Sequence, residues 1–173
     1  IFIFCEKPGS ANKLEINYLK SLNKSIKKKI YFNYNLRFSK LHEQLEKFLK
    51  NKKFGKPILI DIKLSSGISF KKKFLNNWRF KTNNNFEKIS GNLGVHYFNL
   101  LLKFFSLVKE KKIINYSINK KNDTGSILIK FENLISNFFF SYSSPMSDEI
   151  VIYFTNCIIK FTNNDVILFY PRD

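Results

Sequence analysis

Short apolar runs separated by turn-forming residues fill the last third of the sequence, and this pattern restricts the fold more than any other feature. The runs cover residues 113–118, 125–131, 134–142, 149–154, 157–161 and 166–170. Connections such as Glu132-Asn133 and 162–165 are as short as those of β-hairpins. We therefore predict a large, mainly antiparallel sheet for this part of the chain.

The first 35 residues follow a different pattern. Residues 1–5 form an apolar run that predicts a buried strand, and residues 6–9 predict the turn that ends it. Ser10 is the expected N-cap of a helix, and residues 29–35 predict a second strand. A strand–helix–strand unit of this kind belongs to a parallel sheet and cannot bury its own faces. We expect the rest of that sheet to precede position 1, which is then not the natural start of the protein.

Helices and one further strand are expected between these two regions. Residues 39–50 have the apolar spacing of an amphipathic helix, 57–64 predict a strand, 65–90 a long loop, and 91–108 a strongly apolar helix. His42 falls on the charged face of the first of these helices, beside Glu43 and Glu46, and is predicted to be an ordinary surface residue.

The helix predicted from residue 91 has one polar stripe. Its members, at positions i, i+4, i+7 and i+11, are Asn92, His96, Asn99 and Lys103. Because the rest of the helix is apolar, the stripe faces either solvent or a cleft. A core histidine bound to a backbone carbonyl is the other structural interpretation. Histidine titrates near neutral pH and suits proton transfer, so His96 is a candidate acid or base.

Other candidate residues lie next to predicted strand ends or stand out by type. Glu6-Lys7-Pro8 follows a strand at the carboxyl edge, where open parallel sheets bind ligands. Arg37 and Arg79 stand out because arginine is rare among thirty basic residues, and Trp78 is the only tryptophan. Arginine binds phosphate with two donors and tryptophan offers a stacking face. The alternatives are an ordinary strand-ending turn, a surface ion pair and a core aromatic residue.

Composition narrows the class of partner. The net charge of +17 is compatible with nucleic-acid binding, but the lysines are mostly scattered rather than clustered, so we expect no nucleic-acid partner. No apolar stretch approaches the roughly 20 residues that cross a bilayer, so we expect no membrane partner. Cys5 and Cys157 lie far apart in strand-like runs, which favours reduced thiols and a cytoplasmic location over a disulfide or a metal site.

Several motifs, taken in order, carry a resemblance to a known family. They are Glu6-Lys7-Pro8 after a strand, Tyr34-Asn35-Leu36-Arg37-Phe38, Phe54-Gly55-Lys56-Pro57, Trp78-Arg79 and Gly91-Asn92-Leu93-Gly94-Val95-His96. Their order and spacing resemble the glucose-fructose oxidoreductase / inositol dehydrogenase (Gfo/Idh/MocA) family over nearly the whole chain.

The resemblance implies an α/β (α+β) protein in two parts. Residues 1–36 would be the tail of a Rossmann domain that binds NAD or NADP. Residues 37–173 would be a substrate and oligomerisation domain with a large, mainly antiparallel open sheet, helices on one face and a truncated C-terminus. The Gly-x-Gly-x-x-Gly turn that holds the pyrophosphate is not in this sequence. We therefore expect the missing N-terminal half to bind most of the dinucleotide.

The resemblance also implies roles for individual residues. Lys7 would lie by the nicotinamide and the substrate hydroxyl, and His96 would be the acid or base; these two are the expected catalytic residues. Asn92 stands where many members have Asp, and an amide can orient a hydroxyl but cannot act as a base. The expected cofactor-binding residues are Glu6, Lys7, Pro8, Trp78 and Arg79. The expected substrate-binding residues are Arg37, at the domain junction, Asn92 and His96, with no metal ligand.

The predicted function is hydride transfer between a nicotinamide cofactor and a sugar or nucleotide-sugar, of the kind used in polysaccharide biosynthesis. We expect the 173-residue chain to be inactive without its other half, and to form a homo-oligomer through the open sheet. The alternative is a non-catalytic binding or assembly module of the same fold.

Overall fold

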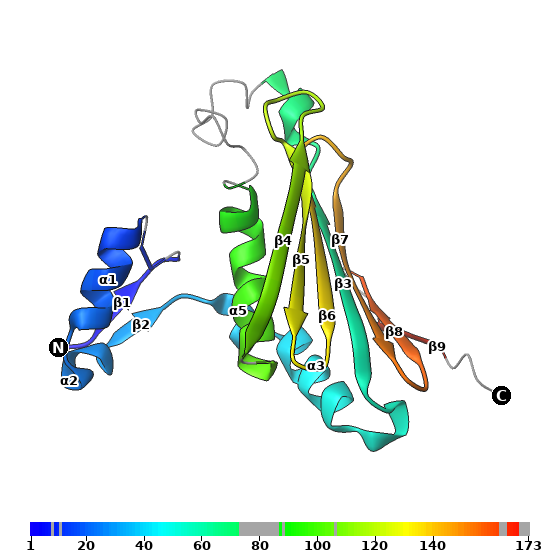
Figure 1. The fold of residues 1–173 in the computed structure, drawn as a ribbon, viewed down its shortest axis with the longest axis horizontal. Helices are drawn as coiled ribbons and strands as arrows, with labels where there is room; N and C mark the ends of the chain where they lie inside the picture. The colour runs from blue at the N-terminus through cyan, green and yellow to red at the C-terminus, as the bar shows by residue number, and fades with distance from the viewer. Residues whose placement is uncertain are drawn as a thin grey trace.

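The computed structural model describes residues 1–7, 9–10, 12–72, 87, 89–105, 107–162 and 166–169. Within these residues the chain forms a small N-terminal unit around a two-stranded sheet and a larger body around a seven-stranded sheet (Figure 1). The two are joined by a short connection that runs past one of the helices of the larger body.

The N-terminal unit has the predicted strand–helix–strand order. Strands β1 (Ile3–Cys5) and β2 (Ile30–Phe32) pair in parallel, and helices α1 (Lys13–Ser21) and α2 (Lys24–Lys27) connect them. The prediction of Ser10 as N-cap is wrong. Asn12 caps α1 instead, because its Oδ1 accepts a hydrogen bond of 3.0 Å from the backbone N–H of Glu15.

Burial in this unit is low. Ile1, Phe2 and Phe4 are 105%, 73% and 72% exposed, so the predicted burial of residues 1–5 is wrong for this chain. The reason is that β1 pairs with β2 alone within the described residues, which leaves the other edge of β1 without a neighbouring strand.

The large sheet confirms the predicted mainly antiparallel architecture. Its strand order is β4-β5-β6-β3-β7-β8-β9, and every neighbouring pair is antiparallel except β3 and β6. The strands are β3 (Pro57–Ser65), β4 (Val108–Tyr116), β5 (Thr124–Phe131), β6 (Ile135–Ser141), β7 (Ser147–Phe154), β8 (Ile158–Phe161) and β9 (Val166–Phe169). Strand β3 therefore lies in the middle of the sheet although it comes first in the chain.

Helices cover one face of this sheet, as predicted. They are α3 (Lys40–Lys50) and α5 (Val95–Phe104), with the π-helical turn η6 (Ser90–Gly94) before α5 and the short 3-10 turns η1 (Asn35–Phe38), η2 (Lys52–Phe54) and η3 (Ile68–Phe70). Figure 1 shows α3 and α5 on the same side of the strands. The predicted end of the long helix at Val108 is wrong, since Val108 begins β4 and pairs with Phe131.

The core lies between these helices and the sheet. Alternate residues of the central strands point toward the helices, so Ile60, Ile62, Phe138, Phe140 and Ile152 are at most 1% exposed. Aromatic pairs extend this core, for example Phe98 with Phe138, whose ring centroids are 4.4 Å apart. The prediction from alternating apolar residues is correct here because one face of each strand is buried.

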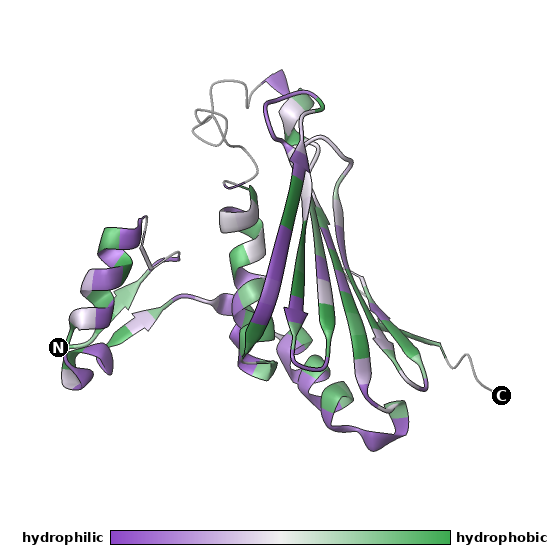
Figure 2. Cartoon of the chain, viewed as in Figure 1, coloured by the Kyte–Doolittle hydropathy of each residue, from purple (hydrophilic) through white to green (hydrophobic). Residues whose placement is uncertain are grey.

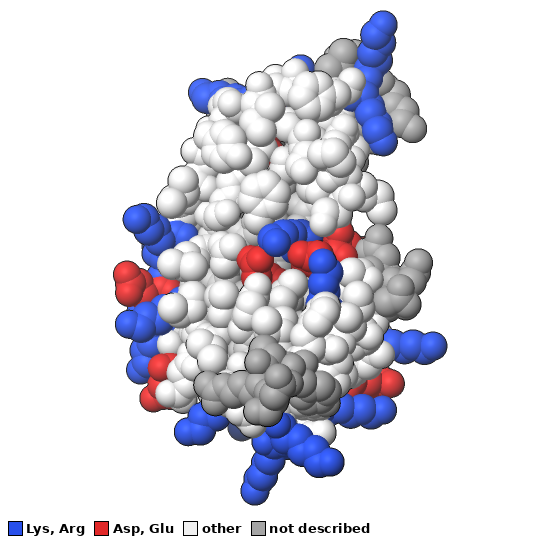
Figure 3. Space-filling view, turned by 90° about the vertical axis from the view of Figure 1, so that its right-hand side faces the viewer, with Lys and Arg blue, Asp and Glu red and all other residues white. Residues whose placement is uncertain are grey.

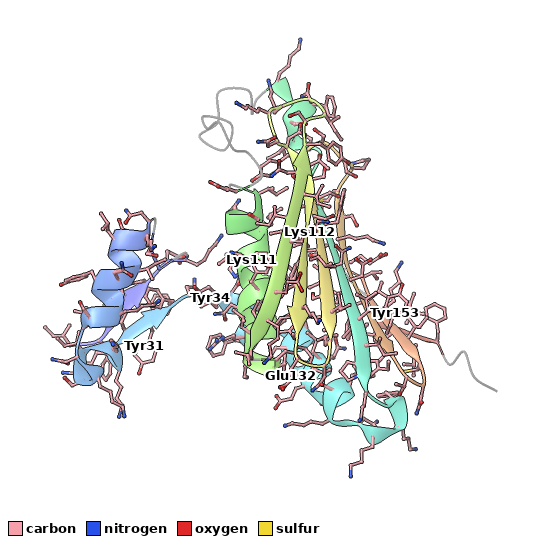
Figure 4. The ribbon with its side chains drawn as sticks, in the orientation of Figure 1. Tyr31, Tyr34, Lys111, Lys112, Glu132 and Tyr153 are labelled. Carbon is pink, nitrogen blue, oxygen red and sulfur yellow. The ribbon has the colours of Figure 1, made fainter. Side chains whose placement is uncertain are left out.

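The other face of the sheet, which we call the outer face, is turned away from the helices. Figure 3 shows it largely uncharged, with acidic and basic side chains gathered near its middle. These side chains come from the central strands. Nδ2 of Asn137 donates to Oδ1 of Asp61 at 2.7 Å, and Nζ of Lys63 lies 3.3 Å from Oδ2 of Asp61 and 3.4 Å from Oε1 of Glu149. Tyr153 on β7 points to the same side (Figure 4).

The edge strand β4 differs from the central strands. Every one of its residues is exposed, and Figure 2 shows a strongly hydrophilic stretch where the sequence reads Lys109-Glu110-Lys111-Lys112. Charged residues on an exposed edge discourage pairing with other strands. Among the described helices, none is long and apolar enough to cross a membrane.

Candidate functional site

The polar stripe of η6 and α5 makes hydrogen bonds to two residues from earlier in the chain, Lys7 and Arg37. The Nζ atom of Lys7 donates to Asn92 at two oxygens, the backbone carbonyl at 2.8 Å and Oδ1 at 3.0 Å. Further along the stripe, Nε of Arg37 donates to Oδ1 of Asn99 at 2.5 Å. The stripe therefore contacts Lys7 of the N-terminal unit at its beginning and Arg37 of η1 further along.

His96 lies on this stripe one turn after Asn92. It is partly buried, and its Nδ1 atom is buried without a hydrogen-bond partner among the described residues. Burial lowers the pKa of His96 below its usual value, the positive charge of Lys7 lowers it further, and the negative charge of Glu6 partly opposes this. The imidazole is therefore neutral near pH 7 and able to accept a proton.

Glu6 and Lys7 reach the stripe because they follow the end of β1. The parallel register pairs Cys5 with Phe32, so the residues after the two strands lie side by side, and Glu6 Oε1 accepts a hydrogen bond of 2.9 Å from Nδ2 of Asn33. Tyr34 follows in the connection between the two parts of the chain (Figure 4). The carboxyl edge of the small sheet thus faces the beginning of α5.

The π-helical turn sets the position of the stripe against the large sheet. Gly94 is buried in this turn, and a Cβ atom there would lie 2.4 Å from a ring atom of Phe140. Glycine is needed because any side chain would collide with the β6 aromatic residue. The close approach fixes where Asn92 and His96 stand relative to the sheet, and π-turns are often found at functional sites.

The structure brings together some of the predicted site residues. Lys7, Asn92 and His96 form one group, with Glu6 beside it, while Arg37 lies further along the stripe at Asn99. Pro8, Trp78 and Arg79 lie outside the described residues, so their predicted contacts with cofactor remain predictions.

The prediction that His42 is a surface residue is wrong. His42 is 8% exposed, because α3 packs beside α5 and the imidazole stacks on Phe104 with ring centroids 5.4 Å apart. Its Nε2 lies 2.7 Å from Nζ of Lys103, the last member of the stripe. A lysine ammonium group can only donate, so Nε2 of His42 is the acceptor in this contact.

Asn33 is a site residue that sequence reasoning missed, and Asn99 is one whose partner it missed. A signal for Asn33 existed, since two parallel strands that end in register place the following residues together, as Glu6 and Asn33 are placed. Asn99 was recognised as part of the stripe, but its partner Arg37 lies 62 positions earlier, and no local pattern links the two.

A separate hollow of about 310 Å³ lies between α3, α5 and strands β7 and β8. Tyr97 and Asp148 line it, and the Tyr97 hydroxyl donates to Asp148 Oδ1 at 2.7 Å. Burial, with the neighbouring carboxylate, raises the pKa of Tyr97 far above its usual value. Lys7, Asn92 and His96 do not line this hollow, so it is distinct from the group on the stripe.

Comparison with known proteins finds structural but not sequence relatives. No family model and no curated protein matches this sequence. An inositol dehydrogenase homologue from Azotobacter vinelandii, solved with NAD+, aligns with 100% of this chain at a TM-score of 0.79 and 15% identity. An NAD-binding oxidoreductase from Klebsiella pneumoniae aligns with 99% of this chain at a TM-score of 0.82 and 12% identity.

The chain shares its fold with part of each of these solved oxidoreductases. A third example, an oxidoreductase from Thermotoga maritima, aligns with 100% of the chain at a TM-score of 0.80 and 18% identity. The chain spans about half the length of these oxidoreductases, covering 49%, 56% and 51% of the Azotobacter, Thermotoga and Klebsiella proteins. At such identities the likeness concerns the fold, including both the small parallel unit and the large sheet.

Proposed function

We propose that this chain is the substrate-side part of a NAD- or NADP-dependent oxidoreductase of the Gfo/Idh/MocA family, acting on a hydroxyl or carbonyl group of a sugar-like polyol. The observation that carries the proposal is the meeting of Lys7, from the end of β1, with Asn92 and His96 on the stripe. Lys7 and Asn92 belong to two different motifs of the family resemblance, are 85 positions apart in the sequence, and contact each other in the structure.

The comparisons support a polyol ligand. The Azotobacter vinelandii inositol dehydrogenase homologue, also solved with NADH and myo-inositol, aligns with 100% of this chain at a TM-score of 0.80. Myo-inositol is a ring that bears hydroxyl groups, which is the kind of substrate we propose here. The proposed division into residues 1–36 and 37–173 agrees with the separate sheets on either side of that point.

The residues at the junction fit the reacting end of such a system. The buried Nδ1 atom of His96, which has no hydrogen-bond partner among the residues that the structure describes, is a polar atom that a ligand would satisfy. We place Glu6 and Lys7 toward the nicotinamide, with the pyrophosphate held by a preceding Rossmann domain, because Gly-x-Gly-x-x-Gly is not in this sequence. When bound, the nicotinamide accepts or returns the hydride of the substrate carbon.

In this proposal, residues of this chain carry out the proton transfer. In the oxidative direction the O–H proton of the substrate passes to the neutral imidazole of His96 as a C=O bond forms, and a bound nicotinamide would take up the hydride released from the same carbon. The ammonium group of Lys7 stabilises the negative charge that develops on that oxygen. Reduction follows the same steps in reverse, with His96 returning the proton.

Turnover of the enzyme that contains this chain and its nucleotide-binding part tests the proposal. His96→Gln keeps the size and polarity of the side chain but removes proton transfer, so we expect kcat to fall by about 100-fold or more. His42→Gln, the other histidine, is the matched control and should leave kcat nearly unchanged. If His96→Gln turns over every accepted polyol at the original rate, the proposed catalytic role of His96 is wrong.

We also propose that the outer face of the sheet binds a second copy of this chain. The outer face exposes apolar side chains, such as Leu128 and Ile135, each 43% exposed. Its central charges alternate in sign, from Asp61 and Lys63 on β3 to Glu149 on β7 and Lys160 on β8. An alternating row can pair with its own copy when the two rows run in opposite directions, which favours a two-fold assembly.

A further inference from the structure

Asn92 holds Lys7 with two oxygen atoms at once. The ammonium Nζ lies 2.8 Å from the backbone carbonyl and 3.0 Å from the side-chain Oδ1, so one residue supplies two acceptors to one donor group. Both distances are those of well-formed hydrogen bonds. The arrangement fixes the end of a flexible lysine side chain, which otherwise has many rotamers.

The backbone oxygen takes part because of where Asn92 lies. It is the central residue of the π-helical turn Ser90–Gly94, between Gly91 and Gly94. Gly94 holds this turn against Phe140, as described above, so the carbonyl of Asn92 is carried on a fixed piece of backbone. Part of the contact with Lys7 therefore persists whatever side chain occupies position 92.

We propose that Asn92 is a positioning residue for Lys7, and that its two oxygens form an uncharged seat that holds the ammonium group beside His96. The proposal deepens the function given above, because it takes Lys7 and His96 as the reacting pair. It also assigns the Asn92 side chain to Lys7 rather than to a substrate hydroxyl.

The lack of charge on the seat matters for His96. An aspartate at position 92 would form an ion pair with Lys7 and would add a negative charge one helical turn from the imidazole. The amide holds the same ammonium group through its dipole and adds no charge. Lys7 therefore acts on His96 as a cation, against the smaller opposing effect of Glu6, which Asn33 holds in place.

The charged groups that face this seat come from three elements. Glu6 and Lys7 follow β1, His96 belongs to α5, and Arg37 of η1 lies further along the stripe where it binds Asn99. Asn99 is thus a second asparagine on the same stripe with a different cation as its partner. This gives a matched control for a substitution at position 92.

Chemical acetylation of the 173-residue chain, followed by peptide mass spectrometry, reports on the seat directly. Only the neutral amine reacts, so a seat that stabilises the ammonium form slows modification of Lys7. We expect Asn92→Ala, which removes Oδ1, to speed Lys7 acetylation about 3- to 10-fold. Asn92→Asp, which has nearly the same shape, should slow it by about 5-fold or more through the ion pair.

Asn99→Asp makes the same change of charge on the same stripe, but opposite Arg37, and should leave the Lys7 rate within about 2-fold of the original. Asn92→Gln, which keeps an amide, should lie between Ala and the original residue. If Asn92→Ala and Asn92→Asp change Lys7 acetylation no more than Asn99→Asp does, the seat does not exist and the proposal is overturned.

Titration of His96 by NMR gives a second readout that needs no cofactor or substrate. Asn92→Asp should raise the pKa of His96 because the added carboxylate favours the imidazolium form. An unchanged His96 titration would contradict the charge argument even if acetylation changed. Both measurements are independent of turnover, so a failure of the proposed enzymatic function would leave their outcome unaffected.

Discussion

Single buried residues show how polar groups are satisfied in this chain. Asp123 is 0% exposed, and its carboxylate accepts hydrogen bonds from the backbone N–H groups of Ile118, Asn119 and Lys120 at 3.0, 2.9 and 2.6 Å. Ser143 Oγ donates a further bond of 2.5 Å. One carboxylate thereby ties the β4–β5 connection to the segment after β6.

Asp123 should make stability depend on acid pH. Burial alone raises the pKa of this carboxyl, but the hydrogen bonds from Ser143 and the backbone outweigh it and lower the pKa below its usual value. The stabilising contribution is therefore complete above the unfolded pKa of about 4 and is lost as pH falls through the lower, folded pKa. Asp123→Ala should reduce the free energy of unfolding at pH 7 by about 2–4 kcal/mol, measured by urea denaturation.

The control for this change is Glu110→Gln, which removes an exposed carboxylate from edge strand β4. It should alter the free energy of unfolding by less than about 0.5 kcal/mol. The difference between Asp123→Ala and the original chain should also shrink toward pH 3. Equal stability of Asp123→Ala and the original chain at pH 7 would contradict the structural role.

His96 should titrate below its usual range, and Lys7 should be part of the cause. Lys7→Met removes the cation and should raise the pKa of His96 without abolishing the effect of burial, as measured by NMR of the imidazole protons. With the folded pKa below the unfolded value of about 6.5, His96 contributes stability above pH 6.5 and loses it as pH falls below. An unchanged His96 pKa in Lys7→Met would show that the two groups do not interact.

At the scale of elements, Gly94 decides how closely the start of α5 approaches the sheet. A Cβ at Gly94 would lie 2.4 Å from Phe140 and 3.0 Å from Phe98, whereas a Cβ at Gly91, in the same π-turn, would have nothing within 4 Å. Gly94→Ala should therefore reduce the free energy of unfolding by about 1–3 kcal/mol, since a well-packed core resists an added methyl group.

Gly91→Ala is the matched control and should be neutral or slightly stabilising, because it replaces glycine by a better helix former at an exposed position. Thermal unfolding followed by circular dichroism compares the two variants. If both change the melting temperature equally, the effect belongs to the π-turn as such and not to contact with Phe140.

The elements that sequence predicted well are those with a local signal. Strands β5 to β9 were expected within one or two residues, because alternating apolar residues and short connections record burial of one face. The parallel pairing of β3 with β6 was not predicted. It joins residues such as Leu59 and Ile135 across a large sequence separation, and nothing in either strand specifies its neighbour.

The site was predicted only in part, because only some of its residues have a local sequence signal. Lys7, Asn92 and His96 were found from motifs and helical spacing, which are local. The burial of His42 and the pairing of Arg37 with Asn99 depend on how α3 and η1 pack against α5. The π-turn before α5 also has no local signature beyond its two glycines, Gly91 and Gly94.

At the scale of the whole molecule, two surfaces have different roles. The helix side of the large sheet carries the stripe, which contacts Lys7 of the small parallel unit and, further along, Arg37 of η1 and His42 of α3. The outer face carries apolar residues around a central row of charges (Figure 3). The proposed chemistry and the proposed assembly therefore lie on opposite faces of one sheet and can be altered independently.

This separation gives a test of assembly that spares the stripe. Leu128 on β5 points to the outer face, as Asn137, its partner in the register, does, and it is 43% exposed. Leu128→Glu would place a charge in an apolar part of the proposed interface and should weaken self-association about 100-fold or more. Leu102 on α5 is also 43% exposed, on the helix side, so Leu102→Glu is a control of equal exposure and equal charge.

Sedimentation velocity over a range of concentrations distinguishes the outcomes. The original chain and Leu102→Glu should sediment as dimers or larger assemblies at concentrations where Leu128→Glu sediments as a monomer. A specific interface of about 800 Å² on each partner is large enough for this behaviour, and the alternating charges would fix how the two rows align. A monomeric original chain at high concentration, or equal dissociation by both variants, would show that the outer face does not bind a second copy.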